Sequence, residues 1–183
     1  MSVKVTITGK EKLFSQLKGI PKVIEDAVFE ATFEIVEDIQ GRVESKLNSS
    51  IYHNRGGLAG DNKNEVVKDH NGNMVGRVWN DKPVAIFREL GTLLVGQASA
   101  KDLPPDITPV YTQEPWFFPV DSVDIDLTEI YGMPKIKIQG KEFYRTSGQP
   151  ARPYMYPAFK EGVEHADEVY KKHVQEQLRK GLK

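Results

Sequence analysis

The sequence predicts an α+β fold, in which a small antiparallel sheet packs against a long helix in the N-terminal half and an amphipathic helix at the C-terminus. Two long stretches, residues 21–47 and 157–180, repeat apolar residues every three or four positions, which is the period of a helix with a buried face. Between them, Asn71-Gly72 separates two runs of β-forming residues, a strong signal of a hairpin. The chain of 183 residues suffices for a core of its own, and we predict a single domain over residues 1–183.

The N-terminal region is predicted to hold a strand and then two helices. Residues 3–8 alternate apolar and polar side chains, which indicates a half-buried strand ending at Gly9. Residues 10–18 read as a short helix that Gly19 breaks. A long helix then begins at Pro21 and runs to about residue 47.

Two offset apolar stripes follow this long helix and leave only a narrow polar face. The stripes are Ile24, Val28, Ala31, Ile35 and Ile39, and Phe29, Phe33, Val36, Val43 and Leu47. A helix that is apolar around so much of its circumference needs two partners. One is the predicted sheet, and the other is either a helix of the same chain or another subunit. Gly41 permits a kink or an early end, since glycine costs about 1 kcal/mol relative to alanine inside a helix.

The hairpin is predicted from residues 65–69 and 74–79, which flank the four-residue turn around Asn71-Gly72. The next segment, residues 83–90, is ambiguous on its residues alone.

Residues 93–150 differ from their surroundings and are predicted to form a proline- and aromatic-rich elaboration of the core. Residues 116–120 are one candidate strand, and residues 135–139 and 141–146, split at Gly140, are a second hairpin. Seven of the chain's 11 prolines fall in this segment: Pro104, Pro105, Pro109, Pro115, Pro119, Pro134 and Pro150.

The C-terminal helix is predicted to begin at Pro157 and to run to about residue 180, with Gly181 as its C-cap. Its apolar stripe consists of Phe159, Val163, Ala166, Tyr170, Val174 and Leu178.

The composition excludes several classes of protein. A net charge of −1 argues against a strongly basic nucleic-acid binder, and the absence of cysteine excludes disulfides, thiolate metal sites and cysteine nucleophiles. No signal peptide is predicted, and no apolar run approaches the roughly 20 residues that span a bilayer. We therefore expect a protein made in the cytoplasm, with no membrane partner.

No local motif indicates catalysis, a cofactor or a metal. The four histidines are not spaced as metal ligands, and we interpret them as solvated surface residues. Asp121, Asp124 and Asp126 lack the pattern of a calcium loop and are interpreted as a solvated acidic loop. The sequence assigns no catalytic, cofactor-binding or metal-binding residue.

The segment of residues 149–159 carries three prolines, an arginine and three aromatics just before the last helix. Proline fixes φ and disfavours helix in the preceding residue, so we expect residues 149–156 to form a stiff, extended clip. Arg152 is expected either to pair within the chain, with Glu89 or by stacking on Tyr154, or to bind a carboxylate of a neighbouring subunit. Because strand side chains alternate, at least one of Trp116, Phe117 and Phe118 must be exposed or at an interface; these three are the other contact candidates.

Three features carry a family resemblance. The first is the phrase Ala151-Arg152-Pro153, followed by Pro157-Ala158 at the start of the last helix. The second is the phrase Glu89-Leu90-Gly91-Thr92, and the third is the N-terminal order of a strand, a short helix and a long helix. Together they resemble the siphophage tail-completion or neck proteins, which join head and tail and are similar to the lambda minor tail protein Z group. The family often has a Thr-Gly-x-Leu-x-x-Ser-Ile phrase after the long helix, where this chain has only Gly57-Leu58 within residues 55–61.

The resemblance implies a structural protein of the virion without enzymatic activity. It would form a ring, hexameric in the family, at the head-proximal end of the tail, and would contact itself, tail-tube or tail-terminator proteins and head-connector proteins. Duplex DNA would pass through the lumen without sequence-specific binding. Glu89, Gly91, Thr92 and Pro157 are the family-motif residues with a structural role. The candidates for assembly contacts are Trp116, Phe117, Phe118, Arg152, Pro153, Tyr154, Met155 and Tyr156.

Two other functions stay open on the residues alone. One is a small hydrolase with dispersed acid and histidine residues, since catalytic groups need only meet in space. The other is a nucleic-acid-binding module, for which the basic residues are Lys18, Lys22, Arg42, Lys46 and Arg55.

Overall fold

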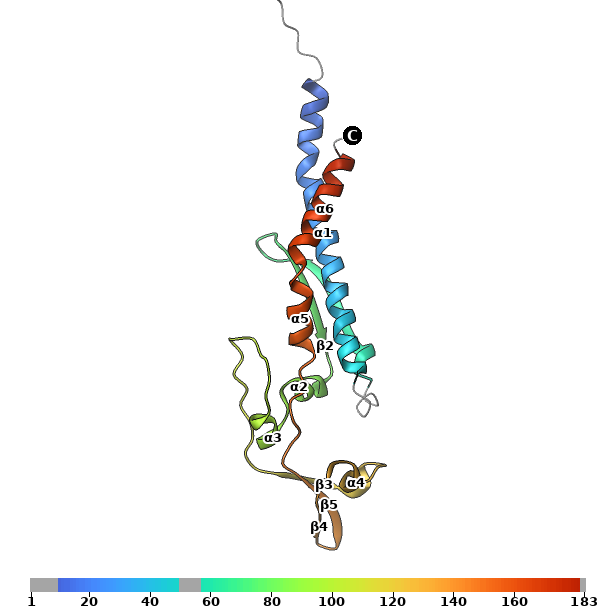
Figure 1. Ribbon diagram of the computed structural model, residues 1–183, viewed down its shortest axis with the longest axis vertical. Coiled ribbons are helices and arrows are strands. Elements are labelled where there is room, and N and C mark those ends of the chain that lie inside the picture. The colour runs from blue at the N-terminus through green and yellow to red at the C-terminus, as the bar shows by residue number, and fades with distance from the viewer. Residues whose placement is uncertain (1–9, 50–56, 182–183) are drawn as a thin grey trace, which may run out of the picture. The chain divides into compact units, whose positions relative to one another are not determined.

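The computed structural model describes residues 10–49 and 57–181, so the predicted strand at residues 3–8 lies outside the described residues. The chain divides into two compact units (Figure 1). Unit 1 contains the chain up to Asn80 and from Ala158 onward, and unit 2 contains residues 81–157. Two small antiparallel sheets, a long N-terminal helix and a C-terminal helical region confirm the α+β class. The single domain stays a prediction, because compactness does not tell whether either unit folds alone.

Helix α1 (Lys10–Asn48) is one continuous helix of 39 residues, so the predicted break at Gly19 is wrong. Pro21 lies inside the helix, where it removes one backbone hydrogen bond. Residues on both sides of this proline line a shallow hollow together with the end of helix α6 (Ala166–Gly181): Ser15, Gln16, Gly19, Ile20, Val23, Leu178 and Gly181. The end of α6 therefore lies beside the part of α1 where the local sequence favours a break. The helix also continues past Gly41.

The two predicted partners of α1 both belong to this chain. One is the sheet of β1 (Asn62–Lys68) and β2 (Met74–Asn80), and the other is α6, which lies beside α1 (Figure 1). The buried side chains of α1 are Ala27, Ala31, Thr32, Ile35, Val36, Ile39, Val43 and Leu47. Ile24, Phe29 and Phe33, which belong to the predicted stripes, are exposed instead.

Strands β1 and β2 form the predicted antiparallel hairpin, with Val66 opposite Gly76. The Asp69 Oδ1 atom accepts hydrogen bonds from the backbone N–H groups of Asn71 and Asn73, and Gly72 takes a φ of 85° to complete the turn. Gly76 faces α1 so closely that an added Cβ would lie 2.3 Å from Val36 Cγ2. The missing side chain lets the hairpin lie flat on the helix.

The last helix was predicted as one element, but the structure has two, α5 (Met155–Val163) and α6, separated at Glu164 and His165. The predicted stripe is also wrong at its start. Ala158 and Gly162 are buried, whereas Phe159 and Val163 are exposed. A Cβ on Gly162 would lie 2.3 Å from Ile39 Cγ1, so small residues permit a close approach of α5 to α1 that the larger ones would prevent.

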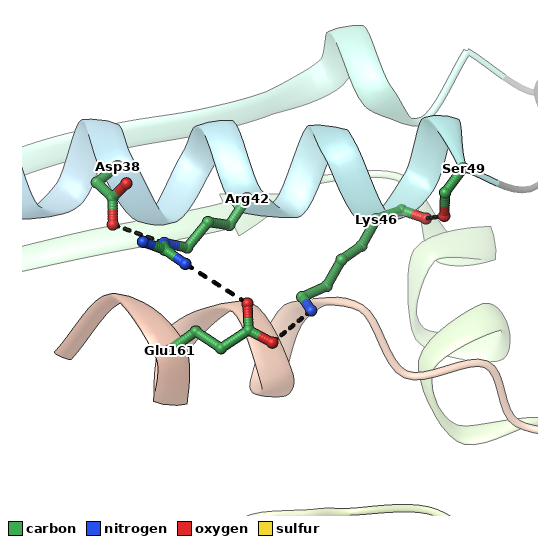
Figure 2. Close-up of polar contacts among 5 residues, drawn as sticks. All are labelled: Asp38, Arg42, Lys46, Ser49 and Glu161. Atoms are coloured by element: carbon green, nitrogen blue, oxygen red, sulfur yellow. Dashed lines mark hydrogen bonds and ion pairs between the residues drawn. The ribbon is translucent and has the colours of Figure 1, made fainter. Parts of the chain in front are cut away.

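Polar side chains join the C-terminal helices to α1 along their length. Glu161 accepts a hydrogen bond from Lys46 Nζ at 2.6 Å and lies 3.6 Å from Arg42, which also binds Asp38 (Figure 2). The Lys46 hydrogen bond holds the pKa of Glu161 below its usual range. Further along, Tyr170 Oη lies 2.9 Å from Thr32 Oγ1.

His173 is not the solvated surface residue that the sequence predicted. Its side chain is mostly buried, with Nε2 2.7 Å from Glu34 Oε2 and Nδ1 3.6 Å from Glu30 Oε2. The hydrogen bond from His173 lowers the pKa of Glu34. The His173 side chain therefore links α1 to α6. His70 and His165 are exposed as expected, and His53 lies outside the described residues.

Gly162→Ala is expected to destabilise unit 1 by about 1–2 kcal/mol, because Ile39 is buried and β-branched and cannot move aside freely. Gly41→Ala is the matched control in α1, since a Cβ there meets nothing within 4 Å; it should stabilise by up to about 1 kcal/mol. Thermal unfolding followed by circular dichroism measures both. A stabilising Gly162→Ala would contradict the close approach.

Unit 2 contains helices α2 (Pro83–Leu90) and α3 (Leu93–Ala98), which resolves the ambiguity of residues 83–90 in favour of helix. A three-stranded antiparallel sheet follows in the order β3-β5-β4, from β3 (Trp116–Pro119), β4 (Lys135–Ile138) and β5 (Lys141–Thr146). The candidate strand and the second hairpin are thereby confirmed. Gln139 and Gly140 both have positive φ, 51° and 82°, as a two-residue type I′ turn requires.

Short helices complete the described chain: η2 (Ala59–Asp61) in unit 1, and η3 (Val120–Ser122) and α4 (Leu127–Tyr131) in unit 2. Across residues 10–49 and 57–181, the structure has no helix that is both long and apolar enough to span a membrane.

Candidate functional site

The two phrases that carry the family resemblance meet within unit 2. The extended clip runs beside the end of α2 and the start of α3. Arg152 N–H donates to the Arg88 carbonyl at 2.8 Å, and Thr92 N–H donates to the Gln149 carbonyl at 2.9 Å. Residues 149–154 form neither helix nor strand, and α5 begins at Met155, so the predicted extended conformation is wrong for Met155 and Tyr156.

Glu89 caps the N-terminus of α5. Its Oε2 atom accepts hydrogen bonds from the backbone N–H groups of Tyr154 at 2.7 Å and Met155 at 3.0 Å, and its Oε1 accepts one from Tyr156 at 3.0 Å. The first four N–H groups of a helix have no partner within it, and a carboxylate there also suits the helix dipole.

Pro157 completes this arrangement. The helix begins at Met155, so Pro157 is its third residue and not the first, as the sequence predicted. The position still suits proline, because its missing N–H removes the one remaining donor of the first turn that Glu89 does not reach. The sequence offered Glu89 as a partner for the Arg152 side chain and missed its capping role; the pairing of Arg152 stays a prediction.

Glycines allow the clip to approach the α2–α3 turn at backbone distance. Gly91 has a φ of 74°, and an added Cβ would lie 2.6 Å from the Ala151 nitrogen. Gly148 has a φ of 103°, and its Cβ would lie 1.9 Å from the Thr92 carbonyl oxygen. Thr92 Oγ1 in turn accepts a hydrogen bond from Gln149 N–H at 3.0 Å. Gly91 and Thr92 therefore let residues 148–151 lie directly against the turn between α2 and α3.

The candidate contact residues of the clip differ in exposure. Tyr154 is 2% exposed, and burial raises the pKa of its hydroxyl to about 12. Arg152, Pro153, Met155 and Tyr156 are half-buried. Tyr154 thus belongs to the interior of the described chain, and the other four present part of their surface.

The three aromatics of β3 are divided between the two faces of the sheet. Phe118 packs on Tyr144, with ring centroids 5.5 Å apart, and is half-buried. Trp116 is 56% exposed and Phe117 is 46% exposed. The expectation that at least one of the three is exposed is confirmed.

A polar cluster that the sequence did not predict supports this sheet from one side. Tyr144 is buried; its hydroxyl accepts a hydrogen bond from Leu127 N–H at 3.1 Å and donates one to Asp126 Oδ1 at 3.3 Å. Asp126 also caps α4 through Thr128 N–H and binds Lys135 Nζ at 2.7 Å. The interpretation as a solvated acidic residue is therefore wrong for Asp126, although Asp121 and Asp124 are exposed.

The hydrogen bond from Lys135, followed by that from Thr128 N–H, lowers the pKa of Asp126 to about 2. A lowered pKa means that the carboxylate stabilises the fold above its unfolded pKa of about 3.9, and that this contribution is lost as the pH falls through about 2. Lys135→Met should raise the midpoint of Asp126 toward the ordinary value in an NMR titration of its carboxyl carbon. Lys137→Met, on the same strand and next to Glu142, is the control and should leave it unchanged. An equal shift in both variants would contradict the assignment.

Metal-ligand groupings give no alternative site in the part of the chain that the structure describes. Within residues 10–49 and 57–181, no three His, Asp or Glu side chains gather as metal ligands. The arrangement found instead is a braced clip beside a small sheet with two exposed aromatics, which is suited to contacts with another macromolecule. Comparisons with protein-family models, with curated proteins and with solved structures gave no match for this chain.

Proposed function

We propose that the protein is a non-enzymatic structural component of a phage virion, which forms a ring at the head-proximal end of the tail and joins the completed tail to the head connector. The observation that carries this proposal is the exposure of Trp116 and Phe117 on β3. Large exposed aromatics on a soluble surface commonly mark contact sites, and aromatic residues dominate the energetics of interfaces.

The resemblance of the two sequence phrases to the neck proteins supports the choice of this particular assembly. These phrases are in contact, through Glu89 and the N–H groups of residues 154–156, so they belong to one structural element. A ring requires two different faces on each copy that fit one another. Its other partners would be tail-tube or tail-terminator proteins, head-connector proteins and the duplex DNA that passes through the lumen.

The competing reading as a nucleic-acid-binding module is weakened by pairing of its basic residues. Lys22 binds Asp26, and Arg42 and Lys46 both contact Glu161. Cations that already neutralise carboxylates contribute less to phosphate binding, since affinity depends on the counterions that free cations release.

The experiment that tests the proposed function is electron microscopy of lysates from the parent phage with a stop codon in this gene. The expected result is separate DNA-filled heads and tails of normal length. Intact, infective virions would overturn the proposal.

Complementation of that phage tests the contact residues. Trp116→Ala and Arg152→Ala should fail to restore joined particles, while circular dichroism shows that the chain stays folded. Val110→Ala, at an almost fully exposed position, and Arg179→Ala, at an exposed position in α6, are the matched controls and should restore them. Normal virions from both test variants would remove these residues from the interface.

A further inference from the structure

We propose that the uncovered face of the β3-β5-β4 sheet docks against the exposed face of α1 in a second copy of the chain. This inference rests on the proposed function, because it names the two faces by which copies would follow one another in a ring.

The register of the sheet assigns its side chains to two faces. Phe118 and Lys135 lie opposite Tyr144, on the face that contacts Asp126 and α4. Phe117 lies opposite Arg145, and Ile136 lies opposite Phe143, on the other face. Neighbouring side chains along a strand point to opposite faces, so the second face consists of Phe117, Pro119, Ile136, Ile138, Lys141, Phe143 and Arg145.

This second face, which we call the basic sheet face, is apolar, cationic and uncovered. Phe117 is 46% exposed and Ile138 is 41% exposed. Lys141 and Arg145 are exposed, and none of the seven residues is acidic. A three-stranded sheet gains stability when a hydrophobic face is covered; Tyr144 is buried on the first face, whereas none of the seven residues of the basic sheet face is buried.

Helix α1 carries a surface of the opposite charge, which we call the acidic helix face. Phe29 is 45% exposed and Phe33 is 41% exposed; the two lie one turn apart. Asp26 and Glu37 are exposed one turn before and after them, and Glu30 lies three residues from Phe33. Asp26 is paired with Lys22, and Glu30 accepts a hydrogen bond from Gln177 of α6, so Glu37 supplies most of the charge that is open to a second copy.

Charge selects how these faces can pair. Docking two basic sheet faces would bring Arg145 and Lys141 of one copy against the same residues of the next, and docking two acidic helix faces would oppose carboxylates. Like charges at an interface are strongly unfavourable, whereas the crossed pairing sets cations against anions and leaves apolar side chains in contact. The chain as a whole is almost neutral, at −1, so the separation of charge is local to these faces.

A crossed pairing also has the symmetry that a ring needs. Each copy offers one face and receives the other, which is a heterologous contact, and such contacts close into rings or continue as filaments. A helix on a sheet face is a common layer arrangement in proteins.

Cysteine cross-linking tests the pairing directly, because the chain has no cysteine of its own. Ile138→Cys places a thiol on the basic sheet face and Phe29→Cys places one on the acidic helix face. When the two variants are mixed under mild oxidation, covalent dimers should form at least about tenfold faster than in either variant alone. Val110→Cys mixed with Phe29→Cys is the control for random collision.

A charge exchange provides the second arm. Arg145→Glu and Glu37→Arg should each weaken self-association, measured by sedimentation, by at least about tenfold. An equimolar mixture of the two variants should restore it, because each altered face then meets an altered face of opposite charge.

The outcomes separate this inference from the proposed function. If the wild-type chain sediments as an oligomer but the mixed thiols do not cross-link, the faces are wrong and the ring proposal stands. Rapid cross-links between copies of Ile138→Cys alone would show a symmetric contact and overturn the inference. A variant with both Ile138→Cys and Phe29→Cys that cross-links within one chain would show that α1 of the same copy is the partner, which also overturns it. If the wild-type chain stays monomeric and the mixed cysteine variants do not cross-link, the inference is overturned too. The stop-codon lysate then decides the proposed function.

Discussion

Gly148→Ala is expected to destabilise unit 2 by about 3 kcal/mol or more, the largest effect of any single substitution considered for this chain. Gly148 has a φ of 103°, a conformation that alanine adopts only with strain. Its added Cβ would also lie 1.9 Å from the Thr92 carbonyl oxygen and 2.7 Å from Leu93 Cβ. Backbone atoms of Thr92 are held by Gln149 and cannot move aside without loss of those hydrogen bonds.

Gly140→Ala is the matched control, because Gly140 has a φ of 82° but a Cβ there would meet nothing within 4 Å. It should cost only the conformational strain, about 1–2 kcal/mol. Urea unfolding followed by the fluorescence of Trp116, in a Trp79→Phe background that removes the only other tryptophan, measures both. If Gly148→Ala and Gly140→Ala lower the free energy of unfolding equally, the backbone near Thr92 can move to accept the added Cβ, and the close approach is not essential.

Glu89→Gln is expected to have the second largest effect. It should lower the free energy of local unfolding at the start of α5 by about 2–3 kcal/mol. The carboxylate accepts three backbone hydrogen bonds through two oxygens. The amide of glutamine keeps one acceptor oxygen and turns an NH₂ group toward N–H donors, so at least one donor is left without a partner. The anionic charge at the helix N-terminus is lost as well.

Hydrogen exchange of the Tyr154, Met155 and Tyr156 amides measures this effect at the place where it arises. Exchange should become about 30- to 150-fold faster, which corresponds to the expected free energy. Glu114→Gln removes the same charge from an exposed position and should leave these amides unchanged. If their protection is the same in Glu89→Gln as in the wild type, another group satisfies the donors and the cap is not Glu89.

The elements that depend on local chemistry could be predicted from the sequence. Asn71-Gly72 and Gly140 each mark a turn whose backbone needs positive φ, and both hairpins form where these residues indicate. The period of apolar residues also located α1 and the C-terminal helices, since it records which side faces a core. Alternation along β3 established that an aromatic would be exposed, but not which one.

The errors lie where a distant contact decides the local structure. Pro21 and Gly19 both weaken a helix locally, yet α1 continues through both, and residues of the end of α6 line the same hollow as this part of α1. The division of α5 from α6 accompanies the close approach of Gly162 to Ile39, which no pattern within the helix reveals. In each case the residues in contact are far apart along the chain, so the pattern of neighbouring residues does not predict the contact.

The capping role of Glu89 was missed for the same reason. The acceptor and its donors are more than 60 residues apart, and the sequence around each is unremarkable on its own. One signal was nevertheless present: a helix that begins with an aromatic segment and a proline has no Ser, Thr, Asp or Asn cap nearby. A helix start without a local cap predicts that a side chain from elsewhere supplies it.

The hydrogen bonds between Thr92 and Gln149 bring the two ends of the intervening segment together. The entropy lost in closing such a loop grows only with the logarithm of its length, so that doubling the loop adds about 0.6 kcal/mol. Loop closure therefore sets little limit on insertions between residues 100 and 146, provided that the residues at its ends and the β3-β5-β4 sheet are kept. The loops of this segment are therefore an insertion site, where added residues carry only a small closure cost.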